Sequence, residues 1–311
     1  MSTKTVVLLG VKIVALTMIL FLCFMVASIV SDAVTPPTSA ESPAGLAQTS
    51  DPTDTSVALL IVCAFQAIVL SYPIIRSRWT GWPLIMAIFF VHYVVMTFLS
   101  QIETVVFLDY LVDVVPTEMI PGLFVQGAIV AALFAPLAVL IHGKIKGPAG
   151  ERPSATAEGT KGSQGPNERL VMPWTEWAWK LALIAVIYVV IYFSFGAFVF
   201  MPLAGDAFQS YYGELQGPAW ILPLQVVRAF IWVASALPII RMMKGQWWEA
   251  GLAVALLFSV LMGFLLLMPN PFMPDAIRQA HFVEVSASNF LFGWIVVWLL
   301  NRHHSSLRDL L

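Results

Sequence analysis

The sequence predicts an all-α polytopic membrane protein, in which eight transmembrane helices form a tandem, parallel repeat of two four-helix units with both termini cytoplasmic. Its composition, eight long apolar runs and a motif shared by the two halves support this fold class. Of the 311 residues, 59% are hydrophobic and only 11% are charged, whereas soluble domains have about 45–50% apolar and about 25% charged residues. This composition excludes a soluble enzyme, and the net charge of −2 gives no basic surface for nucleic acid.

Eight stretches are long enough to span a bilayer, because a transmembrane helix needs about 20 mostly apolar residues. They are continuous rather than alternating, which makes the strands of a membrane barrel a poor alternative. His92 interrupts the third stretch and Arg228 the sixth. The first stretch resembles a signal peptide, but it is longer than a usual apolar core and contains Lys12, so we expect a retained helix. The stretches are 7–30, 56–75, 82–102, 121–142, 177–200, 218–240, 247–268 and 281–300.

Lysine and arginine residues predict the orientation, because cytoplasmic loops are enriched in them. Of the 16 such residues, Arg228 lies within the sixth helix and Arg278 lies on one side of an alternating eight-helix path. All the others lie on the opposite side, which we therefore expect to be cytoplasmic. Short loops favour a cell membrane, specifically a bacterial plasma membrane, as the location.

The two halves share a motif at equivalent points. Residues 73–76, Pro-Ile-Ile-Arg, end the second helix, and the same four residues end the sixth helix at 238–241, an offset of 165. Each proline should kink its helix near the membrane surface, and each arginine can then extend to the lipid headgroups. Four helices per unit give both units the same orientation, so the pseudo-twofold axis should run along the membrane normal. Chance similarity between apolar helices is the alternative.

The predicted organisation has four parts. The first four-helix repeat covers 1–145, a flexible cytoplasmic linker rich in Gly, Pro and Ser covers 146–170, the second repeat covers 171–302, and a cytoplasmic tail covers 303–311.

The loops on the other side of the membrane differ in character. Residues 31–55 should form an irregular external loop. Residues 102–115 form either a short amphipathic helix on the outer surface or an extension of the third helix. Residues 269–276 contain three prolines and cannot form a long helix.

Arg228 is the clearest candidate for a functional residue, because ionisable side chains inside a membrane are costly and commonly functional. It lies about ten residues into the sixth stretch, or about 15 Å at 1.5 Å per residue, which is near the bilayer centre. Gln225, Arg228, Trp232 and Ser235 share one helix face. That face should look into protein or water, either as a solute contact or as part of a buried ion pair.

Two carboxylates, Glu103 and Glu284, are available to pair with Arg228. Helix side chains tilt toward the helix N-terminus, so Arg228 leans outward and Glu103 leans inward from the outer end of the third helix. Glu284 leans away, and we therefore expect Glu103 to be the partner. His92 lies three helical turns before Glu103, on nearly the same face. It could serve a proton relay or be a hydrogen-bonded core residue.

A second polar group opens the eighth helix in the outer leaflet. Arg278, His281, Glu284 and Ser288 line one face, either as a functional cluster or as a solvated helix end. A His-Glu pair at i,i+3 resembles half of a carboxylate-bridged metal site. Because no second pair accompanies it, we expect no metal.

The sequence carries no signature of a particular activity: it has no Walker loop, no GxSxG or HExxH motif and no histidines spaced for haem. We expect no cofactor, and Cys23 and Cys63 should be small core residues. A non-enzymatic membrane scaffold, sensor or assembly factor is slightly favoured. The alternative is a small permease-like transporter of an anionic or carboxylate-bearing solute, with its polar site between the repeats. An intramembrane enzyme using a histidine and a glutamate is least favoured.

The expected partners depend on these hypotheses. The lipid bilayer is one partner and nucleic acid is not. A small solute is a partner under the permease hypothesis, and no sequence feature identifies a protein partner.

Overall fold

The computed structural model describes residues 3–34, 52–106, 117–146, 170–212, 220–270 and 273–301. Within them, eight helices are long and apolar enough to cross a membrane, which confirms the predicted number of spans. The chain is therefore an integral membrane protein with eight candidate spans.

Several of the eight spans are built from more than one helical segment, and a short helix, α9, lies between two of them. The segments are α1 Thr3–Val34; α2 Pro52–Arg76; α3 Gly81–Tyr93 with the π-helix η1 Val94–Phe98 and α4 Leu99–Val106; α6 Met119–Ile141; α7 Trp174–Phe195 with the π-helix η2 Gly196–Phe200 and α8 Met201–Ala204; α9 Asp206–Tyr212; α10 Ile221–Met242; α11 Trp247–Gly263 with the 3₁₀-helix η3 Phe264–Leu267; and α12 Asp275–Asn301.

The helices differ from the apolar runs chiefly at their ends. The last helix begins at Asp275 instead of 281, because its polar first turns are held by an ion pair of 2.6 Å between Asp275 and Arg278. Residues 102–106 continue the third span as helix, as the extension hypothesis expects, whereas 107–115 lie outside the described residues. Most of the predicted external loop and of the linker, 35–51 and 147–169, also lie outside them.

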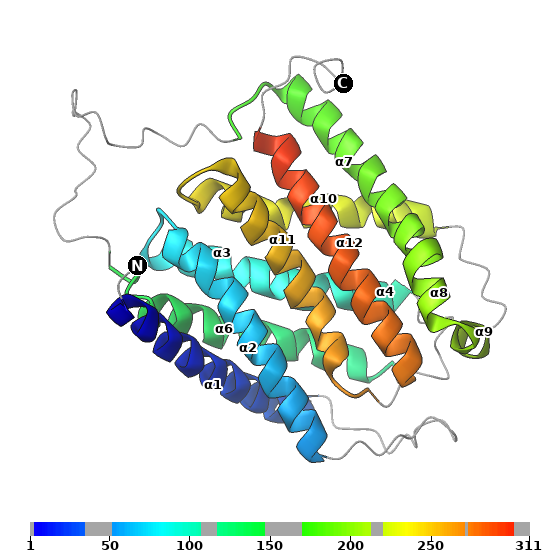
Figure 1. Cartoon of the computed structure of the whole chain (residues 1–311), viewed down its shortest axis with the longest axis horizontal. Coiled ribbons are helices and arrows are strands. Elements are labelled where there is room, and N and C mark those ends of the chain that lie inside the picture. The colour runs from blue at the N-terminus through cyan, green and yellow to red at the C-terminus, as the bar shows by residue number, and fades with distance from the viewer. Residues whose placement is uncertain are drawn as a thin grey trace.

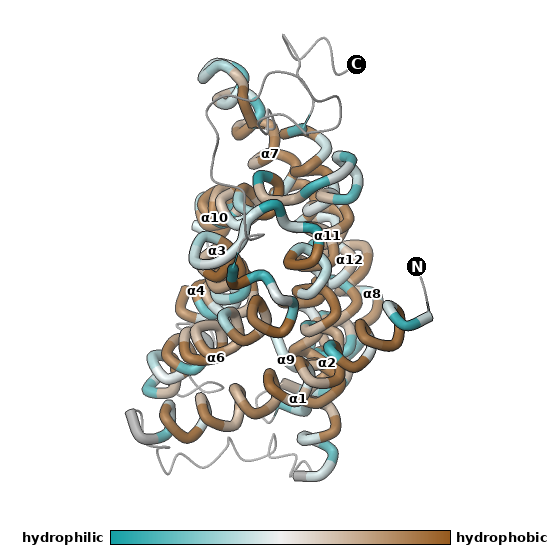
Figure 2. Tube along the Cα trace, turned by 90° about the vertical axis from the view of Figure 1, so that its left-hand side faces the viewer, coloured by the Kyte–Doolittle hydropathy of each residue, from teal (hydrophilic) through white to brown (hydrophobic). Residues whose placement is uncertain are grey.

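The helices form two layers (Figures 1 and 2). One layer contains α6, α3–α4 and α10, and the other contains α2, α11 and α12, with α1 and α7 at opposite edges. At its edge, α1 packs on α2 and α6; at the other edge, α7 packs on α10 and α12. Each layer thus combines two spans from one half of the chain with one span from the other half.

Apolar side chains cover both the inside and the outside of the bundle. Figure 2 shows hydrophobic residues along the helix bodies and hydrophilic residues mainly at turns and helix ends. On the outside, α1 exposes Val7, Val14 and Ile29 by 61%, 65% and 70%. A helix that is apolar all round is typical of a membrane span.

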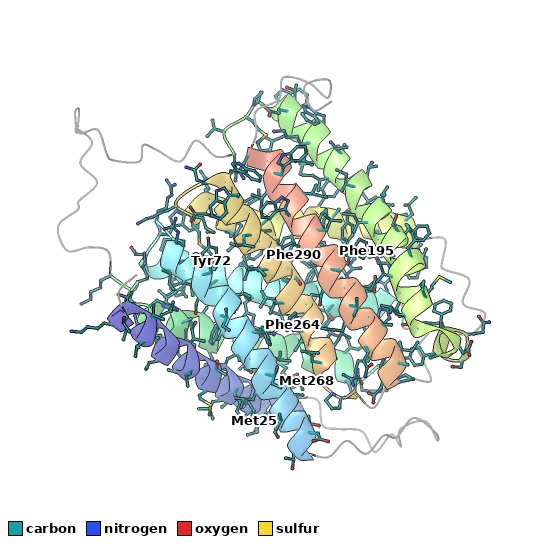
Figure 3. All side chains as sticks on the ribbon, viewed as in Figure 1. Met25, Tyr72, Phe195, Phe264, Met268 and Phe290 are labelled. Atoms are coloured by element: carbon teal, nitrogen blue, oxygen red, sulfur yellow. The ribbon has the colours of Figure 1, made fainter. Side chains whose placement is uncertain are left out.

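Aromatic contacts join the two halves of the chain within one layer. Phe264, at the end of α11, packs on Phe65 of α2 with ring centroids 4.8 Å apart. Figure 3 shows Phe264 and, a turn further on, Met268 beside α2.

The turns that follow α2 and α10 pair directly with each other. Ser77 and Met243 form an isolated antiparallel bridge, in which Arg78 N donates to Met242 O at 2.7 Å and Lys244 N donates to Arg76 O at 2.9 Å. Beside the bridge, Arg76 forms an ion pair with Glu249. Arg76 therefore contacts a carboxylate of the other half, and does not simply extend to the headgroups as the sequence suggested.

Small residues permit the closest helix contacts, as is common between membrane helices. A Cβ atom on Gly293 of α12 would lie 2.9 Å from the Cα of Ala255 and 3.0 Å from Phe258 Cδ2 on α11. A Cβ on Gly127 of α6 would overlap the side chain of Thr97 in η1. At Gly293 the obstacle is backbone, so only a separation of α11 and α12 could make room.

We therefore expect Gly293→Ala to destabilise the fold by about 1–3 kcal/mol, the usual effect of overpacking. Gly10→Ala is the matched control, because a Cβ added to Gly10 of α1 would have no atom of the described residues within 4 Å. Reversible unfolding of the purified protein in mixed micelles measures both. Equal stability of the two variants would contradict the close contact between α11 and α12.

Candidate intramembrane polar site

The polar face of α10 points into the protein. Gln225, Arg228, Trp232 and Ser235 are all buried, as their shared helix face predicted. Arg228 is only 2% exposed. Because α10 begins at Ile221, Arg228 lies seven residues from its start, or about 10 Å at 1.5 Å per residue. It is therefore nearer to the helix end than the sequence suggested.

Arg228 is held by three acceptors. Its Nη1 lies 2.8 Å from Glu103 Oε2 and donates to Gln225 Oε1 at 3.0 Å, while Nη2 donates to the Leu99 carbonyl oxygen at 3.4 Å. The predicted pairing with Glu103 is thus present, and it joins α10 to α4. The opposite tilts of the two side chains along oppositely directed helices explain why they meet.

Two tyrosines of α7 extend this group. Tyr192 donates its hydroxyl hydrogen bond to Glu103 Oε1 at 3.1 Å, and the Trp232 indole donates to the Tyr188 hydroxyl at 3.1 Å. Neither tyrosine was among the residues predicted for the site. Their i,i+4 spacing within an apolar run was the available signal, since it places both hydroxyls on one face.

The ion pair is asymmetric in its exposure. The Glu103 side chain is 28% exposed, whereas that of Arg228 is 3% exposed. Arg228 Nε and Gln225 Nε2 are buried without a hydrogen-bond partner among the described residues. Because an uncompensated charge in a low-dielectric interior costs several kcal/mol, Arg228 depends on Glu103 more than Glu103 depends on Arg228.

π-Helical segments flank the group on two spans. η1 ends immediately before Leu99, and η2 begins four residues after Tyr192. A π-bulge adds one residue to a helical turn and is frequent at functional sites. The added residue rotates the remainder of the span by about 100°, so His92 and Glu103 do not share the face that an unbroken helix predicts.

His92 accordingly lies outside the Arg228 group. Its ring meets Phe134 of α6 edge-on, with centroids 5.7 Å apart, and it is fully buried. Neither ring nitrogen has a hydrogen-bond partner in the described part of the chain. The structure thus supplies neither the relay partner nor the core hydrogen bond that the sequence suggested.

The second predicted cluster divides into separate contacts. Arg278 pairs with Asp275 and donates from Nη1 to the Leu266 carbonyl oxygen at 2.7 Å. Ser288 donates to the Val285 carbonyl oxygen of its own helix at 3.3 Å. Only His281 and Glu284 contact each other, with Nδ1 and Oε2 3.0 Å apart.

His281 also holds α9 against α12. The Tyr212 hydroxyl lies 2.8 Å from His281 Nε2, and the His281 ring stacks on Phe200 of η2 at 3.9 Å. Burial, followed by nearby Tyr211, Glu103 and Glu284, raises the pKa of Tyr212. Glu103 and Glu284 both contribute to this rise, after burial and Tyr211.

Tyr212 was missed because α9 is a short helix between two spans. Neither span length nor membrane burial marked it in the sequence.

The described residues offer little to hold a metal. No group of three or more His, Cys, Asp and Glu side chains is arranged for one among them. Cys23 and Cys63 are buried and free, in agreement with their predicted place in the core. No known protein family, curated protein or solved structure matches this chain.

The difference in exposure between Glu103 and Arg228 predicts which of the two substitutions destabilises the protein more. Glu103→Gln leaves Arg228 charged, buried and without its carboxylate, and should destabilise the protein by about 3–5 kcal/mol. Arg228→Gln leaves a carboxylate that is only partly buried and lies three residues before the end of α4, so we expect a smaller loss. Unfolding in mixed micelles measures both, and Arg228→Gln with Glu103→Gln should recover part of the larger loss. A greater loss for Arg228→Gln than for Glu103→Gln would refute this account.

Proposed function

We propose that this protein is a non-enzymatic membrane scaffold, sensor or assembly factor, in which the Arg228–Glu103 pair fastens the two halves of the bundle. The observation that carries this proposal is the enclosure of the guanidinium. Three acceptors of the protein itself hold Arg228, and it is 2% exposed. A solute site would be expected to leave the charge available for the ligand.

We further propose that the chain is a tandem repeat of two four-helix units, 1–145 and 171–302, joined by the linker. The packing supports this. Each span has a counterpart at the equivalent place in the other half: α1 and α7, α2 and α10, α3–α4 and α11, and α6 and α12. If each span is exchanged with its counterpart, the spans of one layer become those of the other layer. The bridge between Ser77 and Met243 has the local twofold symmetry that an axis between the halves requires.

A permease-like transporter of a carboxylate-bearing solute is the second candidate. Two buried donors without partners among the described residues, Arg228 Nε and Gln225 Nε2, favour it. Glu103 is partly exposed, so its carboxylate occupies the place that an anionic solute would take.

Exchange of the two charges separates the candidates. If the pair only fastens the helices, Glu103→Arg with Arg228→Glu should restore most of the stability lost in Glu103→Gln, because an ion pair re-forms between the same positions. Gln225 can then donate through its amide, while Leu99 loses its donor, so we expect recovery to be incomplete. Mixed-micelle unfolding measures the recovery.

A flux measurement completes this test. Under the scaffold proposal, vesicles that contain the wild-type protein and are loaded with a panel of small carboxylates should lose them no faster than equally loaded vesicles without protein. Carboxylate efflux that is abolished by Arg228→Ala in a protein that still inserts would replace the scaffold proposal with the permease. Failure of the charge exchange, with both single variants stably folded, would also count against the scaffold.

We also propose that both termini are cytoplasmic. A fluorescent protein fused after Leu311 should fluoresce in cells, and alkaline phosphatase fused after Thr117 should be active, since that enzyme folds only after export. The reciprocal fusions are the controls and should be silent. Active phosphatase after Leu311 would reverse the proposed orientation.

A further inference from the structure

A group of cations gathers where the turns of the bundle meet, at the end opposite to the Arg228 site. We name it the cationic cluster and define it as Lys12 of α1, Arg78 after α2, Lys144 after α6 and Lys244 after α10. Lys144 Nζ donates to the Ser77 carbonyl oxygen at 3.0 Å. Arg78 Nη2 donates to the Met243 carbonyl oxygen at 3.3 Å. The cluster thus spans the seam between the two halves.

Within the described residues, the cluster has no carboxylate of its own. The acceptors that hold Arg78 and Lys144 are neutral backbone oxygens, and Arg78 Nε is buried with no hydrogen-bond partner among the residues that the structure describes. Glu249, which lies nearby, already pairs with Arg76. No ion pair in the described part of the chain therefore offsets the mutual repulsion of these four cations.

Burial and neighbouring cations act together on two bases at the cluster. Burial, and then Lys244, lowers the pKa of Lys144. Burial, and then Lys12 and Lys144, lowers the pKa of His142 to about 4. Like charges disfavour the protonated form of a neighbouring base, so an anion bound here would relieve both groups.

Two exposed tryptophans beside the cluster indicate the level of the lipid headgroups. Trp82 and Trp248 flank the paired turns at the same end of the bundle and are 69% and 48% exposed. Tryptophans concentrate at the membrane–water interface. Lys and Arg side chains bind phosphate oxygens through charge-assisted hydrogen bonds, and basic pockets between membrane helices bind anionic lipid headgroups.

We propose that the cationic cluster binds the phosphate of an anionic phospholipid headgroup at the seam between the halves. The tryptophans and the position between helix ends favour a lipid over an acidic segment of a soluble protein. This proposal is independent of the scaffold function, because it concerns the opposite end of the bundle.

The test compares full-length protein in bilayer discs of phosphatidylcholine with and without phosphatidylglycerol. Native mass spectrometry after extraction measures phosphatidylglycerol retained per protein. Lys12→Gln with Lys244→Gln should reduce apparent affinity by about 25-fold, since each cation contributes about a factor of 5. The side chains of these two lysines hold no other element of the described fold in place, so the variant should fold. Lys4→Gln with Lys146→Gln removes the same charge at the same end and should retain the lipid.

Three other results of this experiment would each contradict the proposal. Equal retention by both double variants would mean that net charge alone attracts the lipid. Retention that inorganic phosphate abolishes, together with stabilisation by phosphate in phosphatidylcholine discs, would assign the cluster to free phosphate. Absence of retention in the wild-type protein would leave an acidic protein segment as the occupant.

His142 provides a second readout that a purely structural role would not move. Its pKa is about 4 in the folded protein against an ordinary value of 6.5, so the unfolded chain binds more protons between these values. Stability is therefore lost as pH falls from about 6.5 to about 4. A bound phosphate offsets Lys12 and Lys144, raises the pKa of His142 and should reduce this loss.

Thermal midpoints across this pH range, with and without phosphatidylglycerol, measure the effect. His142→Gln is the control, because a glutamine can keep the contact with Ser71, which lies 2.9 Å from His142 Nε2, but does not titrate. An acid-dependent loss that phosphatidylglycerol leaves unchanged in the wild-type protein would contradict the proposal.

Discussion

An arginine enclosed in an apolar bundle has to be neutralised by the protein, and this constraint governs the arrangement around Arg228. Water cannot reach the guanidinium, which is 2% exposed, so its charge must be matched by groups that the fold delivers. Glu103 supplies the charge and Leu99 supplies a carbonyl, both from α4. α4 and α10 are therefore fixed against each other in depth and in rotation, and α7 is fixed in turn through the Tyr192 hydrogen bond to Glu103.

The two ends of the bundle join the halves of the chain by different means. At one end the contact is charged and partly buried, between Glu103 and Arg228. At the other end it combines a backbone bridge between Ser77 and Met243 with the ion pair between Arg76 and Glu249. Between them, apolar contacts such as Phe65 with Phe264 supply packing without directional preference. The polar contacts thus set the register, and the apolar contacts fill the space.

Features that depend on hydropathy and chain direction could be predicted from the sequence, and features that depend on local backbone geometry could not. The eight spans follow from apolar run length, and the choice of Glu103 over Glu284 follows from the tilt of helix side chains. The π-segment η1 leaves no mark in hydropathy, so the face of His92 was misplaced. Tyr212, which contacts His281, was missed because it lies in the short helix α9 between two spans, and neither the length nor the hydropathy of an apolar run marks such a segment.

The order in which the chain is made gives the separation of Glu103 and Arg228 along the sequence a consequence for biogenesis. Synthesis proceeds from the N-terminus, so α4 enters the bilayer long before α10. The carboxylate is synthesised first; it lies three residues before the end of α4 and its side chain stays 28% exposed in the finished fold. The residue that arrives later is the arginine, which finds its counter-charge already in place. If the arginine preceded the glutamate in the sequence, the arginine would be in the bilayer without its counter-charge until the later helix was synthesised.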